Sequence, residues 1–462
     1  MSDFMQTEIR SSVHRMACRN VKEEHKDSYE EAVSYIMDIP RFNGKNTPED
    51  TRCFYEYMNC PGSATSVIHV AGTNGKGSVC AFLNGVLQQM EKRTAMFVSP
   101  HLIDIRERIR IQDQLISKAD FTNAFSQVCK QVECFNCEKE KEYHPSFFEF
   151  LFFMAMLYFE REQPDFILLE TGLGGRLDAT NVIESPKICI ITEIGFDHME
   201  YLGNTLEEIA FQKAGIIKKN IPVVFWDKCT KTSKVIENFA EKMHAPCIKV
   251  SKENGNLKAI HDKDIDFSYR SLYYKDVDLK IPSKAVYQAD NAILALTALE
   301  TIFTKEELST LILQQGIGRM HWEGRMEKIG RRLVVDGAHN VDGCEAFLNS
   351  VSLLPRQGRR LLFCAVSDKQ IEQMAKMIEE SDLFKEIITA PIQSERSMNR
   401  IQLEQLFKAN QEIGVFASVP DALQHLFSES DQGDIIYCTG SLYLVGQIKQ
   451  YMENRTFRNE EL

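Results

Sequence analysis

The strongest constraint on the fold lies at residues 67–90, where an apolar segment is followed by a glycine-rich turn and a helical pattern. Residues 68–71 are predicted to form a short buried strand, and apolar residues from Val79 to Leu87 recur at helical spacing. Strand, glycine turn and helix in this order favour phosphate binding, because glycines let backbone N–H groups converge and the helix N-terminus adds partial positive charge. We therefore predict a nucleotide phosphate site here rather than a purely structural turn.

The turn carries the side chains that phosphate binding requires, but it departs from the usual Walker pattern. Lys76 is suited to neutralise phosphate oxygens, and the Ser78 hydroxyl is suited to contact phosphate or magnesium. In the usual pattern the hydroxyl residue directly follows the lysine, whereas here Gly77 separates the two. The predicted nucleotide-binding residues of the turn are Gly72, Thr73, Asn74, Gly75, Lys76, Gly77 and Ser78.

Composition restricts the class of protein and its partners. A chain of 462 residues is too long for one ordinary core, so more than one domain is expected. The formal charge of −12 argues against nonspecific binding to nucleic acid or to anionic membranes. Residues 1–26 lack the apolar segment of a secretory signal, and the apolar run at residues 147–159 is too short to span a bilayer. We expect a cytoplasmic, monomeric protein that acts on small molecules, with neither nucleic acid nor membrane as a partner.

Cysteine usage also favours a reducing compartment. The 13 cysteines are scattered along the chain, as expected for free thiols in the cytosol. Cys129, Cys134 and Cys137, with His144 beyond them, have a spacing that zinc sites use. Because this segment contains a single CxxC pair and lies between helical stretches, we favour free thiols over a metal site.

Acidic and histidine side chains follow two predicted strands, which is where open parallel sheets place ligand-facing groups. Glu170 ends the apolar strand at residues 165–170 and is a magnesium candidate, the alternative being an acid that faces water. Asp197 and His198 follow the strand at residues 187–193. A lone histidine is usually structural, but this one is expected at the same sheet edge as Glu170, which favours a ligand role.

Arg106, Arg108 and Arg110 lie at alternate positions. In an extended segment, alternation places the three guanidinium groups on one side. Two interpretations stay open: a solvated strand face, or a carboxylate-binding edge for an acidic substrate.

The remaining pattern predicts an α/β protein of two domains. Residues 228–284 are expected to form a peripheral β-rich excursion, and the glycine-rich segment 316–325 marks a domain boundary. Beyond it short strands alternate with helices again, which predicts a second parallel sheet. We predict a phosphate-loop domain over residues 1–318 and a Rossmann-like α/β domain over residues 319–462.

Together the motifs resemble the folylpolyglutamate synthase/dihydrofolate synthase family, within the Mur ligase superfamily, over about residues 29–451. The resemblance rests on the phosphate loop and on Ser99-Pro100-His101-Leu102, residues 172–181, Asp197-His198, Lys213-Ala214-Gly215-Ile216 and Asp336-Gly337-Ala338-His339-Asn340. The segments at 99–102 and 172–181 separate this family from the cell-wall Mur ligases. The resemblance implies ATP-dependent ligation of L-glutamate to a folate or dihydropteroate carboxylate through an acyl phosphate, with Mg²⁺ and K⁺ as metal cofactors.

The resemblance also implies roles for individual residues. The implied ATP contacts beyond the phosphate loop are Asn291, Arg325 and Asp336. The implied magnesium ligands are Ser99, Glu170 and His198. The implied substrate-binding residues, around the pterin, are Ser146, Phe147, Phe148, Glu149, Leu177, Asp178 and Ala179. The implied catalytic residues are Lys76, His198, Lys213 and His339, the last either orienting phosphate or amine, or serving only as a hydrogen-bonded loop residue.

Two positions depart from the family pattern. Lys213 matches a lysine that the family carries as a CO₂-derived carbamate, whose carboxylate helps to hold a second magnesium. Gln212 stands where the family commonly has glutamate, and this change disfavours carbamylation. Residues 393–398 lack the proline–arginine–alanine pattern expected after Thr389, so glutamate recognition is expected to differ there.

Two other functions compete with the folate ligase. A Mur-type ligase for another carboxylate would need a uridine-binding domain, and little chain precedes Gly72 to form one. A nucleotide-dependent switch would have no use for Glu170, His198, Lys213 and Arg325 together. The motifs do not distinguish dihydropteroate from tetrahydrofolates as the substrate.

Overall fold

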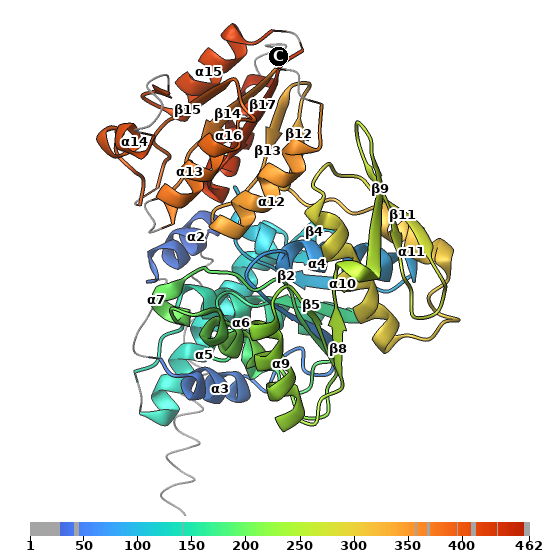
Figure 1. The fold of residues 1–462 in the computed structure, drawn as a ribbon. Helices are drawn as coiled ribbons and strands as arrows, with labels where there is room; N and C mark the ends of the chain where they lie inside the picture. The colour runs from blue at the N-terminus through green and yellow to red at the C-terminus, as the bar shows by residue number, and fades with distance from the viewer. Residues whose placement is uncertain are drawn as a thin grey trace, which may run out of the picture.

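The structure is a computed structural model that describes residues 28–40, 46–140, 142–355, 358–366, 370–394, 396–407, 413–431 and 433–456. The chain forms two α/β lobes, the first coloured blue to yellow in Figure 1 and the second orange to red above it. The predicted α/β class with two separate main sheets is confirmed. The segment expected to lack a signal, residues 1–26, lies outside the described residues.

A mixed eight-stranded sheet organises the first lobe, in the order β4-β3-β2-β5-β1-β6-β7-β8. The central strands β1 (Ser66–Ala71), β5 (Phe166–Glu170) and β6 (Ile188–Ile191) are parallel and almost wholly buried. Buried parallel strands are expected to be apolar throughout, because helices cover both faces of such a sheet. The outer strands are β2 (Thr94–Phe97), β3 (Ile109–Ile111), β4 (Gln114–Leu115), β7 (Val223–Trp226) and β8 (Cys247–Val250).

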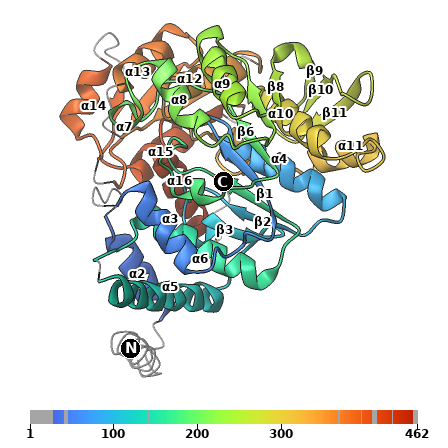
Figure 2. The ribbon, with the colours of Figure 1, turned by 90° about the horizontal axis from the view of Figure 1, so that it is seen from below.

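Helices pack on both faces of this sheet, since alternate residues of each strand point in opposite directions. Ile68 and Val70 face one cluster and Val67 faces another. The first face is covered by α4 (Lys76–Gln89), α10 (Tyr287–Ile302) and α11 (Thr310–Gly318), which lie together in Figure 2. The second face is covered by α2 (Tyr29–Asp38), α3 (Pro48–Tyr57), α5 (Lys118–Lys139), α6 (Phe147–Glu162), α8 (Leu206–Ala214) and α9 (Thr230–Lys242), and the short α7 (Met199–Leu202) precedes α8.

The β-rich excursion predicted over residues 228–284 is wrong in its first half. That half contains α9, and β8 pairs with β7 in the main sheet. Ile236 and Ala240 of α9 are one helical turn apart and bury together against α8, a spacing that the surrounding lysines and threonines obscure. The antiparallel excursion comprises β9 (Gly255–Ile260), β10 (Ile265–Tyr269) and β11 (Val277–Ile281).

The three alternating arginines do not share one extended face. Ile105–Arg108 forms a 3₁₀ turn, so Arg110 alone of the three lies in a strand. Asp104 caps this turn and also pairs with the Arg106 guanidinium at 2.6 Å. The expectation of a single guanidinium face is therefore wrong, because a capped turn replaces the extended backbone that it required.

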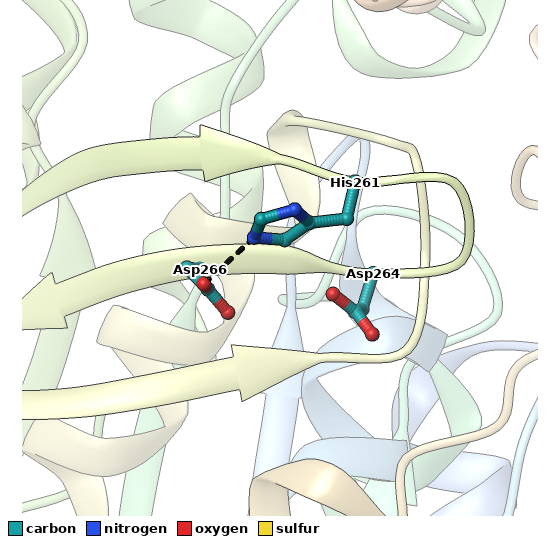
Figure 3. A group of neighbouring side chains, drawn as sticks. All are labelled: His261, Asp264 and Asp266. Atoms are coloured by element: carbon teal, nitrogen blue, oxygen red, sulfur yellow. Dashed lines mark hydrogen bonds and ion pairs between the residues drawn. The ribbon is translucent and has the colours of Figure 1, made fainter.

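His261, Asp264 and Asp266, at the β9–β10 turn, form a grouping of described side chains that has metal-ligand spacing (Figure 3). His261 Nε2 lies 2.8 Å from an Asp266 carboxylate oxygen. Lys280 Nζ lies 3.5 Å from a carboxylate oxygen of each aspartate, so the hairpin balances much of this charge itself.

Cys129, Cys134 and Cys137, the triad considered above for zinc, all lie on α5, and none of the three is in a disulfide. The described part of the chain contains no helix that is long and apolar enough to span a membrane. The cytoplasmic location and the monomeric state stay predictions.

A six-stranded sheet organises the second lobe, in the order β12-β13-β17-β14-β15-β16. It was expected to be parallel, but β12 (Glu327–Ile329) pairs antiparallel with β13 (Leu333–Val335) through a short hairpin. The other strands are parallel: β14 (Arg359–Phe363), β15 (Glu386–Thr389), β16 (Gly414–Val415) and β17 (Ile435–Thr439). The helices are α12 (Val341–Ser352), α13 (Ile371–Glu380), α14 (Arg400–Leu406), α15 (Val419–Glu429) and α16 (Leu442–Thr456).

The lobes meet near α12, which lies on the lower side of the second lobe in Figure 1. The predicted boundary after Gly318 coincides with the end of α11, which packs on α4 and β11 of the first lobe. The second sheet begins nearby, at Glu327. The boundary itself stays a prediction.

Replacing Phe54 by alanine should destabilise the first lobe strongly. Its side chain is fully buried, and its ring centroid lies 5.3, 5.0 and 4.9 Å from those of Phe135, Tyr143 and Phe153. We expect urea unfolding to show a loss of about 3–5 kcal/mol. Leu311→Ala, at a side chain that is 59% exposed, should change stability by less than about 0.5 kcal/mol. Equal losses in the two variants would contradict this account of the core.

Candidate active site

The phosphate loop joins β1 to α4, as predicted. Gly72 and Gly75 have φ values of 152° and 91°, which side chains rarely adopt. A Cβ atom on Gly75 would collide with the side-chain oxygen of Asn291, and one on Gly72 would collide with the Thr192 hydroxyl. The loop is therefore glycine-rich because its neighbours approach the backbone directly, and Asn291 of α10 is one of those neighbours.

The side chain of Lys76, the first residue of α4, is held over the phosphate loop by carbonyl groups of the loop itself. Its Nζ donates to the carbonyl oxygens of Gly72 and Thr73, both at 3.2 Å. The same atom lies 3.9 Å from a carboxylate oxygen of Glu170, at the end of β5. The ammonium therefore sits where the loop and the central strand ends converge.

Gln288, which the sequence analysis missed, ties the loop to α10. Its side chain is fully buried, and its Nε2 donates to the Ser78 hydroxyl at 3.1 Å. Its Oε1 accepts from Asn291 Nδ2 at 2.9 Å. The available signal was its position three residues before Asn291, which places both side chains on one side of the same helix, α10.

Trp322, also missed, covers the loop from the segment between the lobes. A Cβ atom on Gly77 would lie 2.6 Å from Cζ2 of its indole ring. The Arg110 guanidinium lies over the same ring, 5.6 Å from the centroid. Gly77, the residue that breaks the Walker pattern, is thus required where this ring packs on the loop.

Glu170 and Ser99 lie together, as their predicted shared role requires. The Ser99 backbone N–H donates to a Glu170 carboxylate oxygen at 3.1 Å. Burial raises the pKa of Glu170, while the positive charges of Lys76 and Arg325 oppose this shift. A buried carboxylate beside positive charges, with one oxygen beyond hydrogen-bonding distance of Lys76, suits a metal ligand.

His198 and Asp197 occupy the loop after β6. His198 Nε2 lies 3.8 Å from an Asp197 carboxylate oxygen, and the imidazole is half-exposed. Desolvation lowers the pKa of His198, against the pull of Asp197, so the neutral, metal-binding form dominates near pH 7. The charge of Lys76 contributes to the pKa shifts of Asp197, His198 and Glu170.

Lys213 is buried on α8, and its Nζ donates to the Gly72 carbonyl at 2.7 Å. Burial, reinforced by the charge of Lys76, lowers its pKa to about 7. Lys213 is therefore a neutral amine far more often at physiological pH than an exposed lysine, which is almost wholly charged.

The second lobe contributes a loop after β13. Asp336 is buried and accepts hydrogen bonds from the Tyr287 hydroxyl at 2.6 Å and from backbone N–H groups of Met326 and Ala338 at 3.0 and 2.8 Å. Arg325 acts on the pKa values of both Asp336 and Glu170, so its charge reaches both lobes.

His339 follows in the same loop. Its Nδ1 lies 2.8 Å from the Gly337 carbonyl oxygen, and its Nε2 lies 3.8 Å from an Asp197 carboxylate oxygen. The ring therefore bridges the lobes, although its role as an orienting group stays a prediction.

Two of the expected pterin-binding residues are occupied by local hydrogen bonds. Glu149 accepts from the backbone N–H of Ser146, the N-cap residue of α6, and from the side chains of Thr51 and Asn46. Asp178 accepts from Leu173 N–H at 2.8 Å and from the hydroxyl of Thr180 at 2.6 Å. Both carboxylates therefore stabilise the local conformation of the chain around them.

The other expected pterin-binding residues differ in exposure. The Phe148 ring packs against Gly172, and Arg108 lies over the Phe147 ring at 5.3 Å from its centroid. Leu177 is 60% exposed, and Ala179 is buried beside it. Contact of this group with substrate stays a prediction.

Comparison with known proteins decides the family. Residues 70–299 match the Mur ligase middle domain, and residues 318–442 match the Mur ligase glutamate ligase domain. The dihydrofolate synthase/folylpolyglutamate synthase of Bacillus subtilis is 31% identical over 459 residues, covering 92% of this chain and 99% of that protein. The chain belongs to the folylpolyglutamate synthase/dihydrofolate synthase family of Mur ligases. It is an ATP-dependent glutamate ligase, as the motifs predict, and the nucleotide-dependent switch is excluded.

Solved structures of the family have the same fold. The folylpolyglutamate synthase of Thermotoga maritima is 28% identical, with a TM-score of 0.78 over 92% of this chain and 97% of that one. A folylpolyglutamate synthase in complex with AMPPCP and folate is 27% identical, with a TM-score of 0.80 over 92% of this chain and 99% of that one. An ATP analogue and folate are therefore ligands of that relative.

Gln288→Met should weaken nucleotide binding. Methionine preserves the volume but leaves the Ser78 hydroxyl and the Asn291 amide without their partner, and unsatisfied buried groups are costly. We expect the KM for ATP to rise about tenfold, with the KM for glutamate almost unchanged, in steady-state assays of ADP release. Gln314→Met, at an exposed glutamine of α11, is the matched control. Unchanged ATP kinetics in Gln288→Met would remove this residue from the nucleotide site.

Proposed function

We propose that this ligase binds ATP between its lobes and adds L-glutamate to a folate or dihydropteroate carboxylate through an acyl phosphate. The observation that carries the proposal is a set of coupled charges from both lobes. Glu170 lies 3.9 Å from Lys76, and the positive charge of Arg325 from the second lobe acts on the same carboxylate. The folate substrate is supported by the names of the relatives and by the ligands of the AMPPCP–folate complex.

The first step brings two anions together, so its barrier is largely electrostatic. A substrate carboxylate oxygen attacks the γ-phosphorus, the bond to the β-phosphate oxygen breaks, and ADP leaves. Lys76 and Arg325 are placed to offset the repulsion, because preorganised cations act most strongly where water is excluded. The glutamate amine then attacks the acyl carbon, and inorganic phosphate leaves.

We propose that Ser99, Glu170 and His198 hold a magnesium ion. A hydroxyl, an ionised carboxylate and a neutral imidazole are all competent ligands. The buried Glu170 carboxylate accepts one N–H from Ser99, and its other oxygen lies 3.9 Å from Lys76, beyond hydrogen-bonding distance. When bound, the ion would neutralise charge on the phosphate oxygens.

We also propose that Lys213 reacts with CO₂ to form a carbamate. The neutral amine attacks the carbon of CO₂, one proton is released, and the new carboxylate becomes a further anionic metal ligand. The support is a buried lysine whose pKa is about 7. The expected unfavourable effect of Gln212 on carbamylation stays a prediction; in the structure its backbone carbonyl accepts from Arg176 N–H at 2.7 Å.

The reaction of Lys213 should depend on pH with a defined sign. Its pKa is lowered from 10.5 to about 7, so the amine is protonated and unreactive below pH 7 and becomes neutral above it. With ¹³C-bicarbonate, a carbamate ¹³C resonance should grow between about pH 6 and 8 and be missing in Lys213→Met. Lys218→Met, at another largely buried lysine, should keep the signal. Loss of the signal in both variants would contradict the assignment.

The ligase activity itself is tested by ADP release. Dihydropteroate and tetrahydrofolate are supplied separately, each with and without glutamate, and sustained release should need both a pterin acid and glutamate. Lys76→Ala should abolish turnover with every substrate, because it removes the central cation of the site. Turnover that is retained in Lys76→Ala, or that proceeds without any pterin acid, would refute the mechanism.

A further inference from the structure

The loop after β6 is fastened to the phosphate loop. Thr73 N–H donates to the Glu193 carbonyl oxygen at 2.8 Å, and the Thr192 hydroxyl donates to the Asn74 carbonyl oxygen at 2.6 Å. This loop, residues 192–198, carries Asp197 and His198 at its end. A shift of either loop therefore moves the other, and with it the groups that face Lys76.

Among the contacts of the second lobe with this pair of loops is a buried amide, that of Asn340. Its Nδ2 donates to Asn74 Oδ1 at 3.0 Å, and Asn74 Nδ2 donates back to Asn340 Oδ1 at 3.3 Å. The same Nδ2 lies 3.4 Å from an Asp197 carboxylate oxygen. Asn340 is 2% exposed, so water does not compete freely for these contacts.

The orientation of this amide is fixed from the side of the second lobe. Asn340 is the N-cap of α12, and its Oδ1 accepts from Gly343 N–H at 2.8 Å. Asn340 also directly follows His339, in the loop that begins with Asp336. The Asn340 side chain thus connects the start of α12, and the loop that contains Asp336, to the phosphate loop.

A second contact joins the loop after β6 to α12, but none of its side chains touches the phosphate loop. Lys228 Nζ lies 2.5 Å from a Glu193 carboxylate oxygen and 2.6 Å from an Asp342 oxygen in the first turn of α12. This ion pair is partly exposed and contributes general attraction between the lobes. The Asn340 amide differs because its hydrogen bonds are directional and end on Asn74.

We propose that Asn340 is a positioning residue that sets the register of the second lobe against the phosphate loop, so that glutamate captures the acyl phosphate before water does. The inference rests on the proposed function. In a shifted register, water would attack the acyl carbon in place of the amine, the bond to phosphate would break, and the starting acid and phosphate would be released. ATP would then be consumed without amide formation, because small displacements of reacting groups reduce capture steeply.

The experiment measures ADP released per amide bond formed by the full chain at saturating substrates, together with the KM for glutamate. Asn340→Ser keeps a good helix cap, but its side chain is too short to reach Asn74. We expect the ratio of ADP to amide to rise about fivefold and the KM for glutamate to rise with it. The KM for ATP should change less than about twofold.

Two controls separate positioning from stability and from general docking. Asn399→Ser makes the same exchange at the exposed N-cap of α14, where Asn399 Oδ1 accepts from Gln402 N–H at 3.0 Å, and the ratio should stay at the wild-type value. Lys228→Met should raise the KM for glutamate while leaving ADP and amide in equal amounts. Asn74→Ala combined with Asn340→Ser should show no larger ratio than Asn340→Ser alone, because both remove one interaction.

Equal amounts of ADP and amide in Asn340→Ser would overturn the inference, as would effects that multiply in the double variant. If Asn340→Ser fails to fold by thermal melting, Asn340→Asp keeps the cap and the size but cannot donate to Asn74 or Asp197, and a wild-type ratio there would overturn it equally. Wild-type protein that releases no ADP in response to a pterin acid and glutamate would defeat the proposed function, and this inference with it. If ADP release equals amide formation in both the wild type and Asn340→Ser, this inference fails while the proposed function stands.

Discussion

The ammonium of Lys76 is the charge on which the rest of the site depends. Two backbone carbonyls of the phosphate loop hold it at 3.2 Å, and Glu170 lies 3.9 Å away. Around it stand acids and bases that burial alone would drive towards neutrality, as the raised pKa of Glu170 and the lowered pKa of Lys213 indicate. The site therefore works as one coupled set of charges.

This dependence explains why two lobes are needed. One loop and one helix N-terminus supply cations on a single side of a bound triphosphate, whereas ligation also requires charge and shape complementarity on the other side. Arg325 and Asp336 come from the second lobe, and Tyr287 links Asp336 to α10 of the first at 2.6 Å. In the proposed function the interface between the lobes is part of the reaction site, and the contact of Asn340 with Asn74 lies in that interface.

The elements near the phosphate loop could be predicted because their signals are local. The strand, turn and helix at residues 67–90, and the carboxyl-end position of Glu170, follow from periodicity and from the geometry of parallel sheets. Gln288 and Trp322 could not be found in this way, because a buried amide or an indole in a linker has no pattern until its partner is known. The arrangement of the three arginines near residue 108 could not be predicted, because alternate spacing does not reveal that Asp104 caps a turn there.

The sequence by itself determined the α/β class, the strand–turn–helix of the phosphate loop and the family, since their signals lie in short local motifs. Only the tertiary structure decided which of those residues share one electrostatic environment, and how the lobes are registered. Asn74 and Asn340 are 266 residues apart, and no local preference of either residue specifies that they meet. Their contact results from the packing of two sheets and α12, which brings a helix cap against a glycine-rich loop.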